Sequence, residues 1–252
     1  MDVGTAIGLL ALAFLVGTYG TIIGAGGGFL LIPALVLIFD LQGANAVGTG
    51  AVALMIIGIT GAFSYNRQGL VARPVAGWFT LGSVPLALLS GWLLANRIDS
   101  RAFTGILGVL LLALAAFVVF GPAMAQSSGP ELAPKRRALA AAGSAVGITS
   151  GTFAVGGGLI TVPLLARMQR LGPHRATATT SATAMASSAA ASLGHTIAGN
   201  VEWTKAGVLV IGAFVGSSLG ARLAGRLSQG AVLVLLAGGL LVAGIPLMVD
   251  AA

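Results

Sequence analysis

The chain repeats itself once, without a gap, at a constant shift of 130 residues (156 − 26 = 130). Three glycines and a proline occur at Gly26–Gly28 with Pro33, and again at Gly156–Gly158 with Pro163. The same shift pairs further identical residues: Gly17 with Gly147, Thr49 with Thr179, Met55 with Met185, Gly69 with Gly199, Gly82 with Gly212, and Gly108 with Gly238. A long internal repeat determines the architecture, because two copies of one sequence form two copies of one structural unit.

The composition places the chain in a membrane. It contains 57% hydrophobic and only 8% charged residues, whereas a soluble domain carries about 25% charged residues. Only helices or closed barrels satisfy the backbone inside a bilayer. The apolar runs are about 20 residues long and do not alternate strictly, so they predict helices. There is no cysteine, and therefore no disulfide or thiolate metal site.

Each half contains five apolar runs, and the second run of each half is short. The expected elements of the first half are Gly4–Ile23, short Phe29–Phe39, Ala44–Tyr65, Pro74–Ala95 and Ala102–Phe120. Those of the second half are Ala138–Val155, short Leu159–Ala166, Ala176–Ile197, Ala206–Ala221 and Ala231–Val249. A helix as short as Phe29–Phe39 reaches only about half of the hydrocarbon core. A short apolar segment after a glycine break is typical of a discontinuous helix, so we expect about eight full and two partial spans.

The predicted fold is an all-α integral membrane protein of two inverted repeats, with residues 1–122 as the first and 138–252 as the second. Residues 123–137 form a polar linker between them. An odd number of elements per half inserts the second half upside down. Loop charges support this, because the loop 40–45 lacks Lys and Arg while its counterpart carries Arg167, Arg170 and Arg175.

Lysine and arginine favour the cytoplasmic side, which gives the repeats an orientation. The linker ends in Lys135, Arg136 and Arg137 and is placed in the cytoplasm, with both termini outside the inner (plasma) membrane. One loop violates the rule, since Arg97 and Arg101 then lie outside.

The glycine breaks are the first candidate site. A helix that begins inside the membrane presents unpaired N–H groups and partial positive charge, which can bind an anion without Lys or Arg. The candidate binding residues are Gly26, Gly27, Gly28, Gly156, Gly157 and Gly158. The alternative is that these small residues only let helices pack closely. A nucleotide-binding loop is excluded, because the segment lacks the last glycine of GxGxxG and no Lys-Ser/Thr follows.

A row of hydroxyl groups is the second candidate site. Thr49 of the first half corresponds to Thr179 of the second, where Thr180 and Ser181 follow. Hydroxyl groups can donate to anionic oxygens without adding charge to the membrane. The alternative is that they bond to their own helix or to a neighbouring one.

His195 is the one titratable side chain near a predicted span, and no Asp, Glu, Lys or Arg lies well inside any apolar run. A carboxylate relay for protons is therefore absent. His195 is the candidate for proton coupling, and the alternative is an interfacial hydrogen-bonding role. Two distant histidines do not make a metal site, so no metal and no cofactor are expected.

The segments GAGGGFLLIPAL and AVGTGAVAL, repeated as AVGGGLITVPLL and ATATTSATA, resemble the TauE/SafE family of sulfite exporters and related permeases. The resemblance covers both halves. It implies a membrane carrier for small sulfur-containing anions such as sulfite or organosulfonates. The residues and the resemblance together indicate a secondary transporter, with export as the expected direction, that exposes a midplane site alternately to each side.

Other functions remain open to different degrees. An anion channel is the nearest alternative, followed by a transporter of carboxylate, sulfate or thiosulfate. No nucleophile–base pair, metal cluster or carboxylate pair supports an enzyme. The expected partners are a small anionic substrate and the lipid bilayer, not nucleic acid, and a homodimer is left open.

Overall fold

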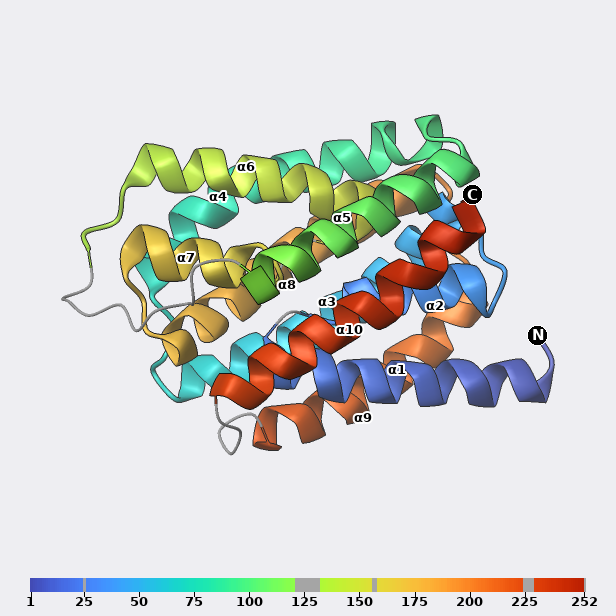
Figure 1. Cartoon of the computed structure of the whole chain (residues 1–252), viewed down its shortest axis with the longest axis horizontal. Coiled ribbons are helices and arrows are strands. Elements are labelled where there is room, and N and C mark those ends of the chain that lie inside the picture. The colour runs from blue at the N-terminus through green and yellow to red at the C-terminus, as the bar shows by residue number, and fades with distance from the viewer. Residues whose placement is uncertain (25, 121–131, 156–157, 224–228, 252) are drawn as a thin grey trace.

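The structure is a computed structural model that describes residues 1–24, 26–120, 132–155, 158–223 and 229–251 (Figure 1). Within these ranges the regular structure is entirely helical. The elements are α1 (Val3–Ile23), α2 (Gly28–Leu37), α3 (Gly43–Arg67), α4 (Arg73–Leu93), the 3-10 turn η1 (Ala95–Arg97), α5 (Ser100–Phe120), α6 (Arg136–Phe153), α7 (Thr161–Gln169), α8 (Pro173–Ile197), α9 (Trp203–Leu223) and α10 (Gln229–Ala251). The predicted all-α class is confirmed.

The helices follow the internal repeat. Helices α3 and α4, moved by 130 residues, give the bounds of α8 and α9 residue for residue. The pairs α1 and α6, α2 and α7, and α5 and α10 agree with the shift to within three residues at each end. Two similar sequences therefore form two similar sets of five helices.

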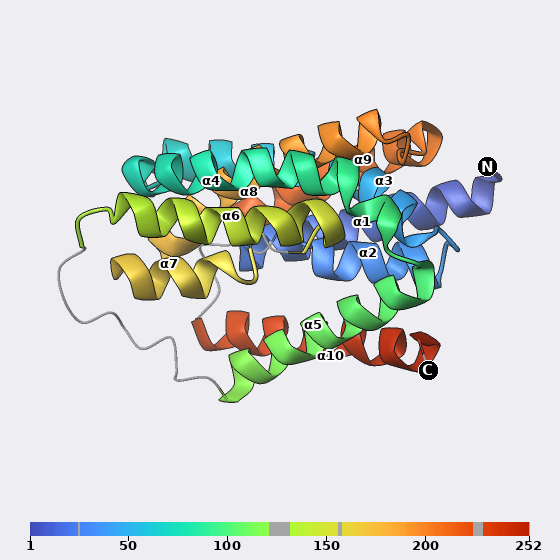
Figure 2. The same cartoon turned by 90° about the horizontal axis from the view of Figure 1, so that it is seen from above.

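The two sets are interleaved rather than separate. Helix α1 packs against α9, and its counterpart α6 packs against α4, so each outer pair takes one helix from each half. Helices α3 and α8 pack against each other, as do α5 and α10, which lie side by side along one face of the molecule in Figure 2. Equivalent helices thus make equivalent contacts with the opposite half.

Small residues make these contacts close. A β-carbon at Gly82 of α4 would collide with the carbonyl oxygen of Ala140 on α6. At the equivalent Gly212 of α9 it would collide with the carbonyl oxygen of Leu10 on α1. Leu10 and Ala140 are themselves related by the 130-residue shift, so the same backbone contact occurs twice. Close backbone approach through glycine is the usual way in which membrane helices pack.

The outer surface suits a lipid environment. Within the described residues, five helices are long and apolar enough to cross a bilayer: α1, α3, α4, α9 and the part of α5 up to Phe117. Large apolar side chains face outward on them, among them Leu15, Phe63, Leu81, Val109 and Ile211. Helix α8 is as long as α3 but rich in threonine and serine. The chain is a multi-pass membrane protein, and the expected total of about eight full spans stays a prediction.

The two short helices and the chain ends also bear on the predicted topology. Helix α2 has 10 residues and α7 has 9, as the glycine breaks predict. The N- and C-termini lie at the same end of the molecule in both views (Figures 1 and 2). Inverted insertion of the second half would produce this arrangement, and the inversion itself stays a prediction.

Candidate functional site

The first glycine break turns the chain from α1 into α2 through left-handed backbone. Gly24, Gly26 and Gly27 have φ angles of 74°, 75° and 82°, a region that glycine enters without steric cost. Gly27 is the N-cap of α2, and no side chain caps this helix. The N–H of Gly26 donates to the carbonyl of Gly20 at 3.2 Å. The left-handed backbone conformation of these glycines therefore produces the break between α1 and α2.

Close packing also requires two of these glycines. The helix-break interpretation and the packing interpretation of the sequence therefore both apply. A β-carbon at Gly27 would lie 2.6 Å from Val16 Cγ1, and one at Gly28 would collide with the carbonyl oxygen of Ala154. Gly26 differs, because a β-carbon there would meet none of the described residues within 4 Å. Of the three, Gly26 is the glycine without a close neighbour in the described part of the chain.

The second break lies between α6 and α7, and Gly156 and Gly157 fall outside the described residues. Its flanks are described. Ala154, the C-cap of α6, has a left-handed φ of 53° and corresponds to Gly24 of the first half. Gly158 lies three residues before α7 begins, and its carbonyl accepts a hydrogen bond from the N–H of Val162 at 3.0 Å.

The two breaks lie against each other. Gly28, the first residue of α2, approaches the carbonyl of Ala154 too closely to carry a side chain. Gly24, at the end of α1, is equally close to the methyl group of Thr177 on α8. The ends of α1 and α6 and the start of α2 therefore converge between the paired helices α3 and α8.

Thr49 and Thr179 are fully buried and bind backbone of the opposite half. The hydroxyl oxygen of Thr49 on α3 accepts a hydrogen bond from the N–H of Glu202 at 3.0 Å, just before α9. The hydroxyl oxygen of Thr179 on α8 accepts one from the N–H of Ala72 at 3.0 Å, just before α4. Glu202 and Ala72 are related by the repeat, so this duplicated pair joins the halves.

Thr180 and Ser181 differ from that pair. Ser181 donates to the carbonyl of Thr177 in its own helix at 3.0 Å. Thr180 is fully buried, and its hydroxyl has no hydrogen-bond partner among the described residues. Thr180 lies one turn beyond Thr177, the α8 residue that touches the first break. Its hydroxyl is thus available to another group in this region.

His195 is fully buried at the junction of α3, α4, α6 and α8. Its Nε2 lies 2.8 Å from the carbonyl oxygen of Gly151, and its Nδ1 lies 3.4 Å from the side-chain nitrogen of Asn200. Nε2–H therefore donates to Gly151, and Nδ1 accepts from Asn200. A β-carbon at Gly48 would collide with the carbonyl oxygen of Asn200, and one at Gly91 would lie 3.1 Å from Cδ2 of the His195 ring. His195 is a hydrogen-bonded core residue, and its role in proton coupling stays a prediction.

Sequence reasoning missed several buried polar groups of the second half. Ser150 and Thr152, in the last turn of α6, have hydroxyls without hydrogen-bond partners among the described residues. The side-chain amide of Gln169, at the end of α7, also lacks partners there. Their counterparts in the first half are Gly20, Ile22 and Phe39. These three positions differ between the aligned halves, and that difference is the signal in the sequence that could have indicated them.

An unpaired buried hydroxyl costs about 1–3 kcal/mol, and each such group in a native protein calls for an explanation. Ser150 and Thr152 lie four and two residues before Ala154, and Thr180 lies three residues after Thr177. All three are therefore within about one helical turn of residues at which the breaks meet. Together with Gly26 they form the candidate site.

Comparisons with known proteins match most of the chain. The family model described as "Sulfite exporter TauE/SafE" matches residues 9–247. A "probable membrane transporter protein" of Haemophilus influenzae is 31% identical over 233 residues, covering 88% of this chain and 87% of that protein. A similarly described protein of Bacillus subtilis is 25% identical over 238 residues, covering 85% of this chain and 87% of its own length.

A third relative, from Methanocaldococcus jannaschii, is also described as a probable membrane transporter protein. It is 31% identical over 163 residues, covering 63% of this chain and 60% of that protein, so the alignment spans less than two thirds of this relative. No solved structure matches the chain.

Proposed function

The chain belongs to the TauE/SafE family, and from this premise we propose that it is a secondary transporter of a small sulfur-containing oxyanion. Sulfite and organosulfonates are the leading candidates, and the family description "sulfite exporter" supports them. The relatives described as membrane transporters support the general class. Export is the expected direction of transport.

One observation carries the proposal. The two chain breaks meet at Gly28 and Ala154, and three buried hydroxyls near this contact, those of Ser150, Thr152 and Thr180, have no protein partners among the described residues. An oxyanion presents several acceptor oxygens, which are the groups that free hydroxyls and helix N-terminal N–H groups bind. The site therefore offers donors without carrying a formal charge.

The absence of a formal charge at the site has an energetic consequence. A buried arginine would bind an anion strongly but would be costly whenever the site is empty. Neutral donors such as Thr180 and Ser150 impose a smaller cost in the empty state. A transporter must bind its substrate weakly enough to release it, and neutral donors suit this requirement.

Alternating access of a midplane site is the proposed mechanism. In discontinuous-helix transporters, half-helices meet near the bilayer midplane and one helical bundle moves against the other. The pairs α1–α9 and α4–α6, each with one helix from each half, would provide the two surfaces that move. An anion channel is the alternative function, and it would use the same donors without a moving barrier.

A thermal-shift screen of the purified protein tests the substrate class. Sulfite, sulfate, thiosulfate, small sulfonates and carboxylates are compared at equal ionic strength. A ligand that binds only the folded state raises the unfolding temperature in a saturable way. Stabilisation by a sulfur oxyanion but not by acetate supports the proposal, whereas selective stabilisation by carboxylates would replace its substrate.

A further inference from the structure

Three arginine side chains lie on the faces of aromatic rings at one end of the molecule. The pairs, with the distance from the guanidinium carbon to the ring centre, are Arg67 on Phe63 (4.5 Å), Arg136 on Trp78 (5.2 Å) and Arg167 on Phe117 (5.6 Å). These distances are typical of cation–π contacts. The first pair lies within α3, the second joins α6 to α4, and the third joins α7 to α5. Figure 1 shows the starts of α4 and α6 and the end of α7 at the end of the molecule opposite the two termini.

The rings of these arginine–aromatic pairs belong to the outer surface. Phe63 is 60% exposed, Phe117 is 43% exposed, and Trp78 is half-buried. Aromatic side chains near the ends of membrane helices, tryptophan above all, mark the level of the lipid headgroups. A guanidinium that lies on such a ring is therefore held at the same level.

The guanidinium groups are open to a ligand. Arg67, Arg136 and Arg167 are exposed, and none has a hydrogen bond or an ion pair within the described part of the chain. The ring covers one face of the guanidinium plane, whereas the five N–H donors point outward along its edges. This planar fork matches the oxygens of a phosphate group. The aromatic contact thus restricts the position of each fork without using its donors.

The positive charge at this end is not balanced by described carboxylates. Beside the starts of α4, α6 and α8 and the end of α7, the chain also carries Arg73, Lys135, Arg137, Arg170 and Arg175. The described Asp and Glu residues lie beside the opposite helix ends, and they are Asp2, Asp40, Asp99, Glu202 and Asp250. Charge complementarity therefore favours an anionic partner for the end with the arginine–aromatic pairs.

The internal repeat shows that the helices do not need these pairs in order to form. Shifted by 130 residues, the six positions are occupied by apolar residues, namely Leu193 and Ile197, Val208 and Ala6, and Leu247 and Leu37. These residues lie in α8, α9, α1, α10 and α2, the counterparts of the helices that carry the pairs. Because equivalent helices form without the pairs, a property of one end of the molecule accounts for them better than a requirement of folding.

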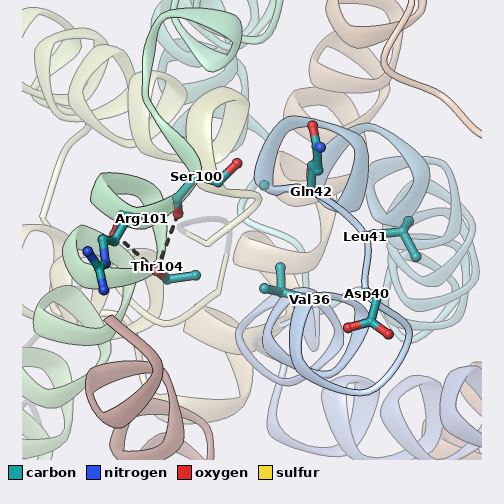
Figure 3. Close-up of a pocket in the computed structure, with 8 residues that line it drawn as sticks. Val36, Asp40, Leu41, Gln42, Ser100, Arg101 and Thr104 are labelled. Carbon is teal, nitrogen blue, oxygen red and sulfur yellow. Dashed lines mark hydrogen bonds between the residues drawn. The ribbon is translucent and has the colours of Figure 1, made fainter. Parts of the chain in front are cut away.

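An arginine at the opposite end has different surroundings. Arg101 contacts no aromatic ring among the described residues. Figure 3 shows its side chain pointing away from Asp40 and Gln42, across the pocket that all three line. Its backbone N–H donates to the Asp99 carboxylate at 3.2 Å, so a negative charge lies beside it. A phosphate near Arg101 would be repelled by this carboxylate, which makes Arg101 a suitable control.

We propose that the arginine–aromatic pairs bind the phosphate groups of anionic phospholipids, such as phosphatidylglycerol, in the leaflet that this end of the molecule meets. The guanidinium holds the headgroup phosphate, and the ring and the apolar surface beyond it contact the acyl chains. In the predicted orientation this leaflet is the cytoplasmic one, whose anionic lipids attract basic segments. The partner is a lipid, and its binding does not depend on which anion the protein transports.

Trp78 is a reporter within one of the pairs, because brominated acyl chains that contact a tryptophan quench its fluorescence. The chain has three tryptophans, and Trp92→Phe with Trp203→Phe leaves Trp78 alone. In liposomes of equal parts phosphatidylglycerol and phosphatidylcholine, either lipid is brominated in turn. The quenching of Trp78 should correspond to an about fivefold preference for phosphatidylglycerol. Arg136→Gln should abolish this preference, and Arg101→Gln should preserve it.

A protein with Trp92 as its sole tryptophan is the control for position. Trp92 is exposed near the end of α4, at the opposite end of this helix from Trp78, and should show a preference of less than about twofold. Equal quenching of Trp78 by the two brominated lipids would overturn the proposal. An equal loss of preference in Arg101→Gln and Arg136→Gln would also overturn it.

The second test separates a lipid from a soluble anion. Purified protein in a neutral detergent is titrated with short-chain phosphatidylglycerol, short-chain phosphatidylcholine and glycerol phosphate. Phosphatidylglycerol alone should raise the unfolding temperature saturably, and replacing the three paired arginines with glutamine should weaken its binding about tenfold. Replacing Arg97, Arg101 and Lys205 with glutamine removes the same charge from the opposite end and should leave the affinity unchanged. Equal stabilisation by glycerol phosphate would assign the arginines to a soluble anion, and equal weakening by both triple replacements would reduce the effect to net charge; either result would overturn the proposal.

Discussion

Tyr65 and His195 occupy equivalent positions in the two halves, and each donates a hydrogen bond to an equivalent backbone carbonyl. The hydroxyl of Tyr65 lies 3.3 Å from the carbonyl oxygen of Thr21, near the end of α1. His195 Nε2 lies 2.8 Å from that of Gly151, near the end of α6. Each side chain therefore ties the helix before a glycine break to the long helix α3 or α8 of its own half.

The first prediction concerns His195. Replacing it with phenylalanine leaves the carbonyl of Gly151 without its donor, which should lower the free energy of unfolding by about 1–3 kcal/mol. If His195 also carries a proton, His195→Gln should abolish pH-driven uptake and preserve substrate exchange. Uptake and exchange are measured in reconstituted protein. Tyr65→Phe, which removes the equivalent hydrogen bond of the first half, is the control. Normal pH-driven transport by a folded His195→Gln protein would exclude the proton-carrying role.

The second prediction concerns the hydrogen bonds between the halves. Thr179→Val removes the acceptor of the buried Ala72 N–H and should destabilise the protein by about 1–3 kcal/mol. Thr49→Val should cost less, because Glu202 is only half-buried and water can reach its N–H. Thermal unfolding in detergent gives the order, and Thr49→Ser and Thr179→Ser serve as controls that keep the acceptor. Equal stability of Thr179→Val and the natural protein would contradict this role.

The third prediction separates binding from stability at Thr180. Because its buried hydroxyl has no hydrogen-bond partner among the described residues, Thr180→Val should leave stability unchanged or raise it, while anion affinity falls by about tenfold. The matched control is Thr183→Val, since Thr183 donates to the carbonyl of Thr180 within the same helix. A loss of stability without a selective loss of affinity at Thr180 would assign its hydroxyl to the core.

The fourth prediction concerns Gly26, where a β-carbon would meet none of the described residues within 4 Å. Its φ of 75° is tolerated by asparagine better than by most residues, so Gly26→Asn should fold and weaken anion binding. Gly27→Val should fail to fold, because its side chain would collide with Val16. Folding is followed by size-exclusion chromatography and binding by thermal shift. Unchanged affinity in folded Gly26→Asn would place the anion elsewhere.

The fifth prediction concerns the inverted topology. Asp40 and Arg170 are equivalent, both exposed, and have φ angles of 50° and 53° after α2 and α7. Single substitutions Asp40→Cys and Arg170→Cys should react with membrane-impermeant reagents from opposite sides of the cell membrane. Gln169, the neighbouring position, is unsuitable because it is fully buried. Labelling of both variants from the same side would rule out inverted insertion.

Much of the fold could be predicted from the sequence, because a repeat and an apolar composition restrict a chain strongly. The glycine runs correctly located both breaks, and the short runs correctly predicted α2 and α7. Which helices would pair could not be predicted. The contacts α1–α9 and α4–α6 depend on backbone approach at positions such as Gly82 and Gly212, and nothing in either helix alone names its partner.

Less of the candidate site could be predicted from the sequence, and the binding role of the predicted residues stays a prediction. Identical residues in the two halves drew attention to Thr49 and Thr179, yet these two hold the halves together. Ser150 and Thr152, whose hydroxyls have no partner in the part of the chain that the structure describes, occur where the halves differ. A duplicated residue more readily serves a contact that both halves need. In the proposed transporter, the substrate would occupy one site between the halves and could use groups that only one half provides.

Counterflow in proteoliposomes tests the central claim most directly. Vesicles containing the purified protein are loaded with unlabelled sulfite under nitrogen and diluted into a trace of ³⁵S-sulfite. A transporter with an alternately exposed site should accumulate the label transiently above its equilibrium level, and Thr180→Val should reduce this overshoot. Protein-dependent equilibration without an overshoot would indicate a channel, and no protein-dependent sulfite movement would contradict the proposed substrate.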